Sequence, residues 1–215
     1  MSEASLGIEE KSMKIIESEI GAHGYNTLQW NVVRRVIHAT ADFDFAKPDK
    51  SGIIFSTNAI ENAFEAFKKR RFIIVDVDMV LSGINKKSVT KIGASVLCNI
   101  SNNEVLKISK SENKTRSALA MRYSSKEIDG GIVAIGNAPT ALCEVIKMIR
   151  EGEAMPSLVI GIPVGFVSAA ESKFELSRTD VEFITNIGRK GGSAAASSIF
   201  NALMLMYINN SNKMN

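Results

Sequence analysis

The sequence predicts a single α/β domain, a three-layer sandwich in which a mostly parallel, doubly wound sheet lies between helices. Short apolar runs of strand length alternate with amphipathic stretches of helix length over most of the 215 residues, as in βαβ units. The apolar runs are nearly continuous, which is typical of strands buried on both faces. No low-complexity linker or fixed-period repeat divides the chain, and its length suits one large domain.

Two helices are expected before the first strand. The first is indicated by isoleucines near helical spacing: Ile8, Ile15, Ile16 and Ile20. The second carries apolar residues in the same pattern: Trp30, Val33 and Ile37. Residues 43–50 contain Pro48 and Asp49, and are expected to form a loop.

Six strands and five further helices are expected after that loop. The strands are predicted at residues 53–56, 72–77, 95–100, 131–136, 157–162 and 181–187. The helices are predicted at residues 58–69, 115–126, 140–151, 169–177 and 193–208. Residues 101–113 are only weakly patterned. The domain is expected to span residues 6–208, with disordered ends at residues 1–5 and 209–215.

The composition is that of an ordinary globular protein, with 45% hydrophobic and 23% charged residues. The 26 basic and 23 acidic residues give a net charge of +3, without the basic stripe and interleaved aromatics typical of nucleic-acid binding. Neither a signal peptide nor an apolar stretch of roughly 18 residues is present. We therefore expect a cytoplasmic protein that binds neither nucleic acids nor membranes.

Metal ligands and nucleophiles are scarce in this chain. His23, His38, Cys98 and Cys143 are too few and too scattered for a structural zinc site. The cysteines are expected to be free thiols in the core, and no Ser-His-Asp or Cys-His arrangement can be argued. The sequence therefore predicts no metal site.

Three glycine-containing turns follow predicted strands, around Gly136, Gly165 and the segment 188–193. Ligands of open α/β sheets bind outside the carboxyl ends of the strands, so these turns are expected to form a backbone-lined floor. The segment 188–193 opens a helix and carries Arg189 and Lys190, so it suits an anion. It matches no nucleotide-binding motif, and a plain tight turn is an equally good interpretation.

Several polar residues stand near these turns. Asn137 can cap a helix or bind a ligand, and Thr115 is a second candidate cap. Arg116 stands in the first turn of a helix, where a cation is unfavourable unless it faces an acidic partner. His38 lies three residues after Arg35 on the same helix face, and an imidazole beside guanidinium groups suits proton transfer to a polyanion.

These segments together resemble the precorrin-8X methylmutase family, also called the cobalt-precorrin-8 methylmutase family. The resemblance runs in order from about Ile8 to Leu205. The strings that carry it are Arg35-Val-Ile-His-Ala-Thr, Asp76-Val-Asp-Met-Val, Lys114-Thr-Arg-Ser-Ala, Ala134-Ile-Gly-Asn-Ala-Pro-Thr-Ala-Leu, Gly161-Ile-Pro-Val-Gly-Phe-Val-Ser-Ala-Ala-Glu-Ser-Lys and Gly188-Arg-Lys-Gly-Gly-Ser-Ala.

The resemblance implies an isomerase that moves a methyl group from carbon 11 to carbon 12 of precorrin-8 or cobalt-precorrin-8, giving hydrogenobyrinate or cobyrinate in cobalamin biosynthesis. It implies no cofactor and no metal bound by the protein. His38 is implied as the proton donor and acceptor, and Ser12 and Arg35 as substrate-binding positions. The resemblance also points to further substrate contacts at Thr115, Arg116, Asn137, Arg189, Gly191, Gly192 and Ser193. It implies a homodimer with a flavodoxin-like sheet and a site at the subunit boundary.

The substrate is a tetrapyrrole-derived ring with several carboxylates, so dispersed arginines and helix N-termini are suitable anchors. A wide, flat ring also suits small residues in the floor, namely Gly136, Ala138, Gly165, Gly191 and Gly192. Two alternatives stay open: a non-catalytic corrinoid carrier and a nucleotide-dependent oxidoreductase. The second is disfavoured because no G-x-G-x-x-G follows the first strand.

Overall fold

The centre of the molecule is a six-stranded sheet with the order β1-β6-β5-β4-β2-β3. The computed structural model describes residues 3–214 of the chain, with side chains for residues 7–212. The strands are β1 (Ile53–Phe55), β2 (Ile73–Val75), β3 (Val96–Cys98), β4 (Ile132–Ile135), β5 (Leu158–Gly161) and β6 (Phe183–Asn186). Strands β2 to β6 run parallel, and β1 pairs antiparallel with β6 at one edge.

The topology confirms the predicted fold class. Without β1, the five parallel strands numbered in chain order have the order 2-1-3-4-5, which is that of flavodoxin-like sheets. Each strand lies within the apolar run predicted for it. Strands β4, β5 and β6 are buried at every residue, as expected for parallel strands covered on both faces.

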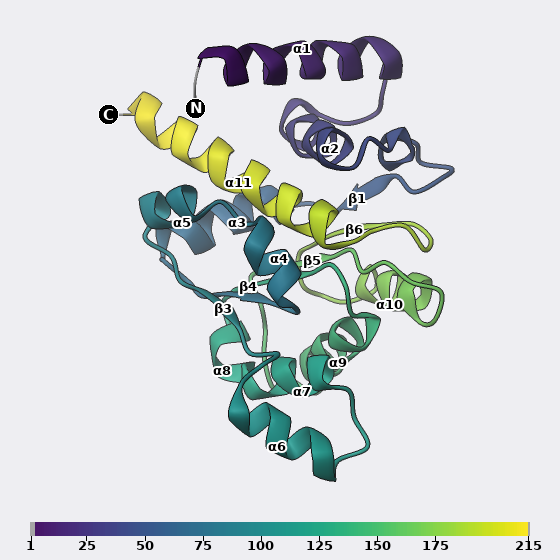
Figure 1. Cartoon of the computed structure of the whole chain (residues 1–215), viewed down its shortest axis with the longest axis vertical. Coiled ribbons are helices and arrows are strands. Elements are labelled where there is room, and N and C mark those ends of the chain that lie inside the picture. The colour runs from purple at the N-terminus through teal and green to yellow at the C-terminus, as the bar shows by residue number, and fades with distance from the viewer. Residues whose placement is uncertain (1–2, 215) are drawn as a thin grey trace.

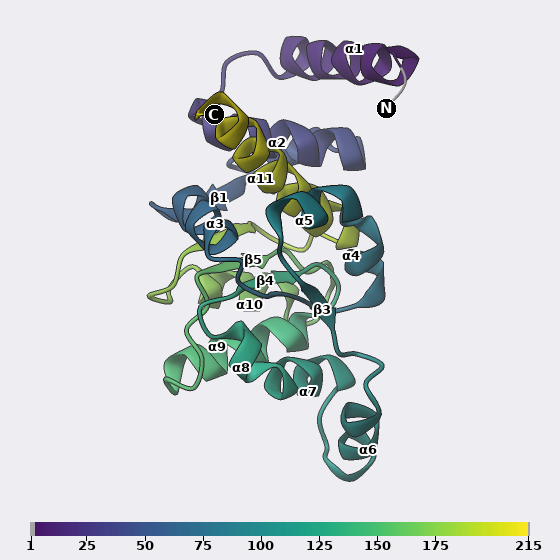
Figure 2. The same cartoon turned by 90° about the vertical axis from the view of Figure 1, so that its left-hand side faces the viewer.

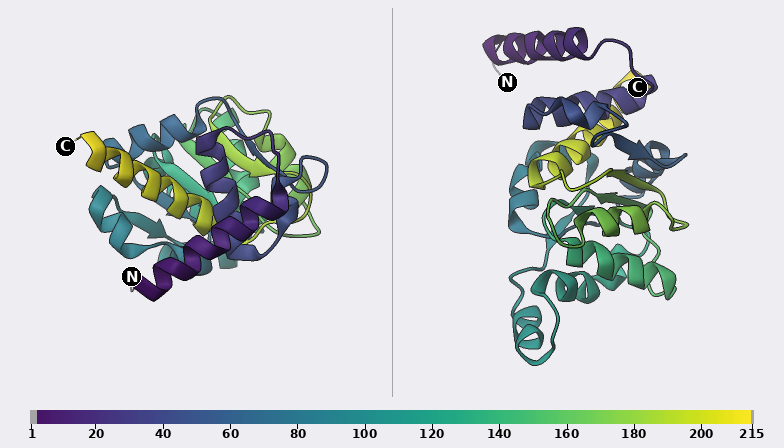
Figure 3. Two further views of the ribbon diagram at one scale, coloured as in Figure 1. Left: turned by 90° about the horizontal axis from the view of Figure 1, so that it is seen from above. Right: turned by 90° about the vertical axis from the view of Figure 1, so that its right-hand side faces the viewer.

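Helices cover both faces of the sheet (Figures 1 and 2). On one face lie α2 (Thr27–Thr40), α3 (Ala59–Lys68), α4 (Asp78–Gly83), α5 (Lys86–Ile92) and α11 (Ser193–Met214). On the other lie α7 (Arg116–Tyr123), α8 (Ser125–Ile128), α9 (Pro139–Arg150) and α10 (Ala169–Leu176). Two helices stand outside these layers (Figure 3): α1 (Glu3–Ile20) packs on α2, and α6 (Asn103–Ser111) packs on α7.

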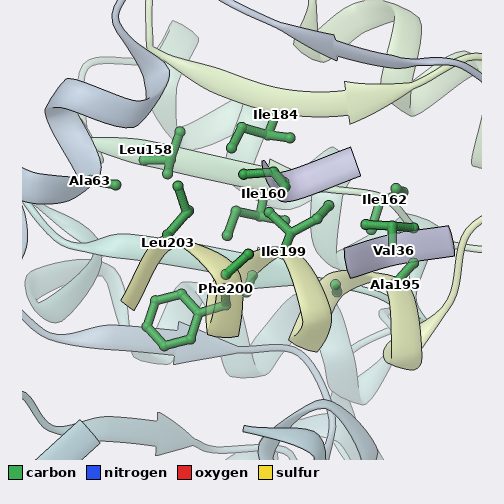
Figure 4. Close-up of a cluster of buried hydrophobic side chains, with 14 of the residues drawn as sticks. Val36, Ala63, Leu158, Ile160, Ile162, Ile184, Ala195, Ile199, Phe200 and Leu203 are labelled. Atoms are coloured by element: carbon green, nitrogen blue, oxygen red, sulfur yellow. The ribbon is translucent and has the colours of Figure 1, made fainter. Parts of the chain in front are cut away.

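Helix α11 contacts each of the other helices of its layer, α2, α3, α4 and α5, and Figure 4 shows its buried side chains against the sheet. Its Ile199 and Leu203 are fully buried and belong to one core cluster with Leu158 and Ile160 of β5 and Ile184 of β6. Burying a side chain of this size contributes about 1.5–3 kcal/mol. This packing holds the first turn of α11 at the carboxyl edge of the sheet.

Helix α2 begins at a capping box and ends beside the start of α11. The Asn26 side chain accepts the N–H of Gln29 at 2.9 Å, and the Gln29 side chain accepts the N–H of Asn26 at 3.1 Å. The stripe Val32, Val33, Val36 and Ile37 is buried in the core that α11 shares. Burial of that stripe leaves His38 exposed and Arg35 half-buried.

Several local predictions were wrong. Helices α4, α5 and α6 were not predicted, because six to nine residues give too few turns for a clear apolar period. Residues 43–50 include a 3₁₀ helix (Phe43–Ala46), and residues 115–126 are divided between α7 and α8 at the buried Ser124. Cys143 is exposed on α9, because it lies on the outer side of that helix.

The ends also differ from the sequence prediction. Helix α1 starts at Glu3 and α11 continues to Met214, so residues 3–5 and 209–214 are helical where disorder was predicted. Residues 1, 2 and 215 lie outside the described part of the chain. No helix among residues 3–214 combines the length and apolar character needed to cross a membrane.

Candidate active site

The site is built at the topological switch point of the sheet, between the parallel neighbours β2 and β4. The strand after β2 is added on one side of this pair, and the strand after β4 is added on the other side. Asp76 follows β2 directly and is fully buried. Its carboxylate accepts the backbone N–H groups of Gly136, Asn137 and Ala138 at 3.2, 2.8 and 2.8 Å. Burial raises the pKa of Asp76, and these three N–H donors oppose that rise. Asp76 thereby fixes the turn between β4 and α9.

The three glycine-containing turns contact one another, as predicted. The Gly192 N–H donates to Ile162 O at 2.9 Å, and the Gly165 N–H donates to Arg189 O at 3.2 Å. A Cβ on Gly136 would lie 2.8 Å from Ser193 Cα, and a Cβ on Gly191 would lie 2.2 Å from Ile162 O. Gly136 and Gly191 therefore serve the close approach of the turns to each other, whereas a Cβ on Gly192 would have only Val164 nearby, at 4.0 Å.

The turn between β6 and α11, residues 187–192, is held from below by two buried side chains. Lys173 of α10 is 1% exposed, and its Nζ donates to Lys190 O at 2.7 Å and to Asn186 Oδ1 at 3.0 Å. Asn186 Nδ2 donates to the same Lys190 O at 2.9 Å. Burial lowers the pKa of Lys173 to about 8.

The same turn is tied to the segment after α2. Lys190 Nζ donates to Asp42 Oδ2 at 2.8 Å and to Asp44 Oδ2 at 2.7 Å. These two contacts raise the pKa of Lys190. The arrangement ties the segment that directly follows α2 to the turn that directly precedes α11.

Two cavities follow α11 from its first turn, and we call them together the α11 groove. The first, of about 350 Å³, lies at the end of α2 and is lined by Ala39, Met79, Gly83, Ser193, Ala194, Ser197, Ser198 and Asn201. The second, of about 410 Å³, is lined by Glu9, Arg35, Asn85, Ser88, Asn201, Ala202 and Leu205. Both include Asn201, whose Nδ2 donates to Gly83 O at 2.8 Å and whose Oδ1 accepts the Asn85 N–H at 2.9 Å.

The N-termini of α7 and α9 meet at a cluster of hydroxyl groups. Thr115 caps α7 by accepting the Ala118 N–H at 3.3 Å. Its Oγ1 also donates to Thr140 Oγ1 at 2.8 Å, and Ser117 Oγ lies 3.1 Å from the same atom. Arg116 is exposed in this first turn. Helices α7, α9 and α11 thus direct their N-termini to the carboxyl edge of the sheet, where they favour anions.

Comparison with known proteins decides the family. The family model for precorrin-8X methylmutase matches residues 7–206, nearly the whole chain. The chain belongs to the precorrin-8X methylmutase family. The resemblance found in the sequence is thereby confirmed.

Individual members of the family resemble the chain over similar lengths. A cobalt-precorrin-8 methylmutase from Priestia megaterium is 47% identical over 93% of this chain and 87% of that protein. One from Leptospira interrogans is 41% identical over 93% of this chain and 92% of that protein. The crystal structure of a precorrin-8X methylmutase from Thermus thermophilus matches with a TM-score of 0.87 and 37% identity, covering 95% of this chain and 97% of that one.

Most of the site residues predicted from the sequence lie along the carboxyl edge of the sheet. Arg35 lines the second cavity of the α11 groove, and Ser193 lines the first, directly after the turn that contains Arg189, Gly191 and Gly192. His38 lies on α2 next to Ala39, which lines the first cavity. Asn137 is exposed in the neighbouring turn, with Thr115 and Arg116 beyond it. Ser12 lies on α1, three residues after Glu9, and lines neither cavity of the groove. Its Oγ donates to Ile8 O of the same helix at 2.9 Å. The α1 residue that contacts α2 near the groove is Glu9, which lies 2.5 Å from Arg35.

The sequence analysis missed the buried or bridging residues whose hydrogen bonds hold the turns and helices of the site in place. Asp76, Lys173 and Asn186 were noted, if at all, only as members of motifs or strands, and Asn201 was not noted. Each acts through a partner distant in sequence, so no local spacing indicates its role. One available signal was an ionisable residue inside or beside an apolar run, which Asp76 provides directly after β2.

Proposed function

We propose that this protein moves a methyl group from carbon 11 to carbon 12 of precorrin-8 or cobalt-precorrin-8, with His38 as the proton donor and acceptor. It is a member of a methyl-shifting isomerase family of cobalamin biosynthesis, as the match over residues 7–206 supports. The observation that carries the role of His38 is its place in the last turn of α2, exposed and next to Ala39, which lines the α11 groove. We propose that the reaction takes place in the cytoplasm.

The proposed chemistry needs one acid and a shaped surface. Protonation of the conjugated ring makes it poorer in electrons, which favours migration of the methyl group. The bond from the methyl carbon to carbon 11 breaks, a bond to carbon 12 forms, and the proton returns to His38. Atoms and electrons balance within the substrate, so no external oxidant or reductant takes part. A cation is favoured at a helix C-terminus, and this suits a group that is positively charged before it donates.

The carboxylates of the ring are proposed to bind along the carboxyl edge of the sheet. Arg116 and Arg189 are exposed there, and the N-termini of α7 and α11 add backbone N–H donors. Asn137, Gly191, Gly192 and Ser193 are proposed contacts from the turns. Arg35 pairs with Glu9, so a substrate carboxylate would replace Glu9 or share the guanidinium with it. Ser12 is proposed as a contact from α1.

Substitution of His38 tests the catalytic role. We expect His38→Ala to lower the rate of isomerisation by about 10²- to 10⁴-fold, the usual contribution of a general acid, while affinity for the corrinoid changes little. The rate is followed by the absorption change that accompanies the altered conjugation of the ring. His23→Ala is the matched control, because His23 stacks on Trp30 at 4.0 Å, near the opposite end of α2.

The same experiment separates an isomerase from a carrier. A wild-type protein that binds the corrinoid without changing its absorption over time would support a non-catalytic carrier and contradict the proposed activity. Unchanged turnover in His38→Ala would leave the isomerase intact but remove His38 from the mechanism.

A further inference from the structure

Lys173 is a buried cation that the proposed chemistry does not use. It lies within α10, is 1% exposed, and no carboxylate in the described part of the chain forms an ion pair with it. Removing an ammonium group from water is costly unless hydrogen bonds compensate. Its two acceptors, Lys190 O and Asn186 Oδ1, are neutral. The protein therefore keeps a positive charge at a buried position where a neutral side chain would have a smaller desolvation penalty.

The charge lies directly beneath the turn of residues 187–192. The Lys190 carbonyl that it binds belongs to the segment that carries Arg189 and leads into the first turn of α11. We propose that Lys173 is a positioning residue for corrinoid binding: its ammonium fixes this turn from below and supplies positive charge to the carboxylates bound above. This inference rests on the proposed function, since it assumes a carboxylate-bearing ring at the carboxyl edge.

Neighbouring charges are mostly engaged elsewhere. Lys190 pairs with Asp42 and Asp44, and Arg189 lies 5.6 Å from the centre of the Phe166 ring. On α10 and the adjoining α9, the acidic groups are Glu171, which is exposed, Glu175, which pairs with Arg150 and Arg178, and Glu144, which pairs with Arg122. The further cation of α9, Lys147, is exposed and pairs with Glu151. The carboxylates of a bound ring would be new negative charges close to Lys173.

Binding and protonation are therefore coupled. The lowered pKa of Lys173, about 8 in the free protein, means that its ammonium is lost at mildly alkaline pH. Bound carboxylates favour the charged form and raise that pKa, so by linkage the affinity must fall as pH rises through 8. Lys190 stays protonated over this range because Asp42 and Asp44 raise its pKa.

The test is the pH dependence of the dissociation constant for hydrogenobyrinate, measured by absorption titration between pH 6.5 and 9.5. For the wild type we expect a roughly fivefold weaker affinity at pH 9 than at pH 7, with a limit of about tenfold at higher pH, which corresponds to a rise of one unit in the pKa of Lys173 on binding. For Lys173→Met we expect a similarly weakened affinity already at pH 7 and a flat profile. Lys147→Met, which removes an exposed lysine of α9, should behave as the wild type.

Lys173→Arg separates charge from packing. An arginine keeps the charge but does not titrate in this range, so it should restore affinity at pH 7 and abolish the fall above pH 8. An affinity of the wild type that does not change with pH would overturn the inference, and this result does not depend on the folding of any variant. The same fall in affinity with pH in Lys173→Met would also overturn it. Absence of hydrogenobyrinate binding by the wild type at every pH would instead contradict the proposed function.

Discussion

Single residues set the geometry of this site by filling space or bridging turns. A side chain on Gly136 or Gly191 would overlap backbone of the next turn, so these glycines are needed for the close packing of the turns. Asp76 joins β2 to the turn after β4 through three N–H groups, and Lys173 joins α10 to the turn after β6. All four act on backbone, so their removal would shift several ligand-facing groups together.

Burial of Lys173 has a consequence for stability as well as for binding. The pKa of this lysine is about 8 in the folded protein against 10.5 in the unfolded chain. Above pH 8 the unfolded state therefore binds more protons, and the free energy of unfolding should increase with pH until about 10.5. The gain is at most about 3 kcal/mol, since one pKa unit corresponds to about 1.4 kcal/mol.

Urea unfolding of the wild type and of Lys173→Met across pH 7–10.5 measures this gain. The free energy of unfolding of the wild type should rise above pH 8 relative to that of Lys173→Met, whichever protein is the more stable at pH 7. The Lys147→Met variant corrects for other groups that titrate in this range. A difference that stays constant with pH would show that Lys173 does not titrate as its burial requires.

Whole helices contribute their N-termini to the site. Helices α7, α9 and α11 start at the same edge because each follows a strand or loop that ends there. The hydroxyl cluster of Thr115, Ser117 and Thr140 holds the first turns of α7 and α9 together. Asp76 already binds the N–H groups of Asn137 and Ala138 before α9, so the anion-attracting surface is formed mainly by the first turns of α7 and α11.

Thr115→Ala should destabilise the protein by about 1 kcal/mol, because it removes the cap of α7 and the hydrogen bond to Thr140. Denaturant unfolding monitored by circular dichroism measures the change. The control is Thr90→Ala, since Thr90 donates only to Lys86 O of its own exposed helix, and its substitution should cost under about 0.5 kcal/mol. Equal losses of stability in the two variants would contradict a stabilising role for the contact between α7 and α9.

At the scale of the whole molecule, the site lies among exposed apolar side chains. Phe166 and Val167 on the loop before α10 are 84% and 79% exposed, and Met79 at the start of α4 is 69% exposed. Helix α1 stands outside the α/β layers and contacts them through α2 (Figure 3). Groups of exposed apolar side chains commonly mark an interaction surface. We therefore propose that the protein works as the homodimer that its family resemblance implies, with its site near the subunit boundary.

The homodimer is tested by sedimentation velocity at micromolar concentration, where the species should have twice the mass of one chain. Phe166→Asp should shift it towards the monomer, because burying a carboxylate in an apolar interface is unfavourable. Glu61→Asp, an exposed change on α3, should leave the mass unchanged. A wild-type monomer with full isomerase activity would contradict the proposal.

The sequence by itself determined the fold class, the six strands, and the glycine turns at the carboxyl edge. These features depend on local apolar patterns and on backbone requirements that are written within a few consecutive residues. The long strings around His38, Gly136 and Gly188 also sufficed to indicate the family, because their residue order and spacing can be compared directly along the sequence.

Only the tertiary structure decided which residues support the site and which face outward. The role of Asp76 depends on the strand order that places β2 beside β4, and the role of Lys173 depends on the packing of α10 under the turn after β6. Asn201 likewise connects α11 to the start of α5. Each contact joins segments far apart in sequence, and its chemistry depends on burial, which local spacing does not encode.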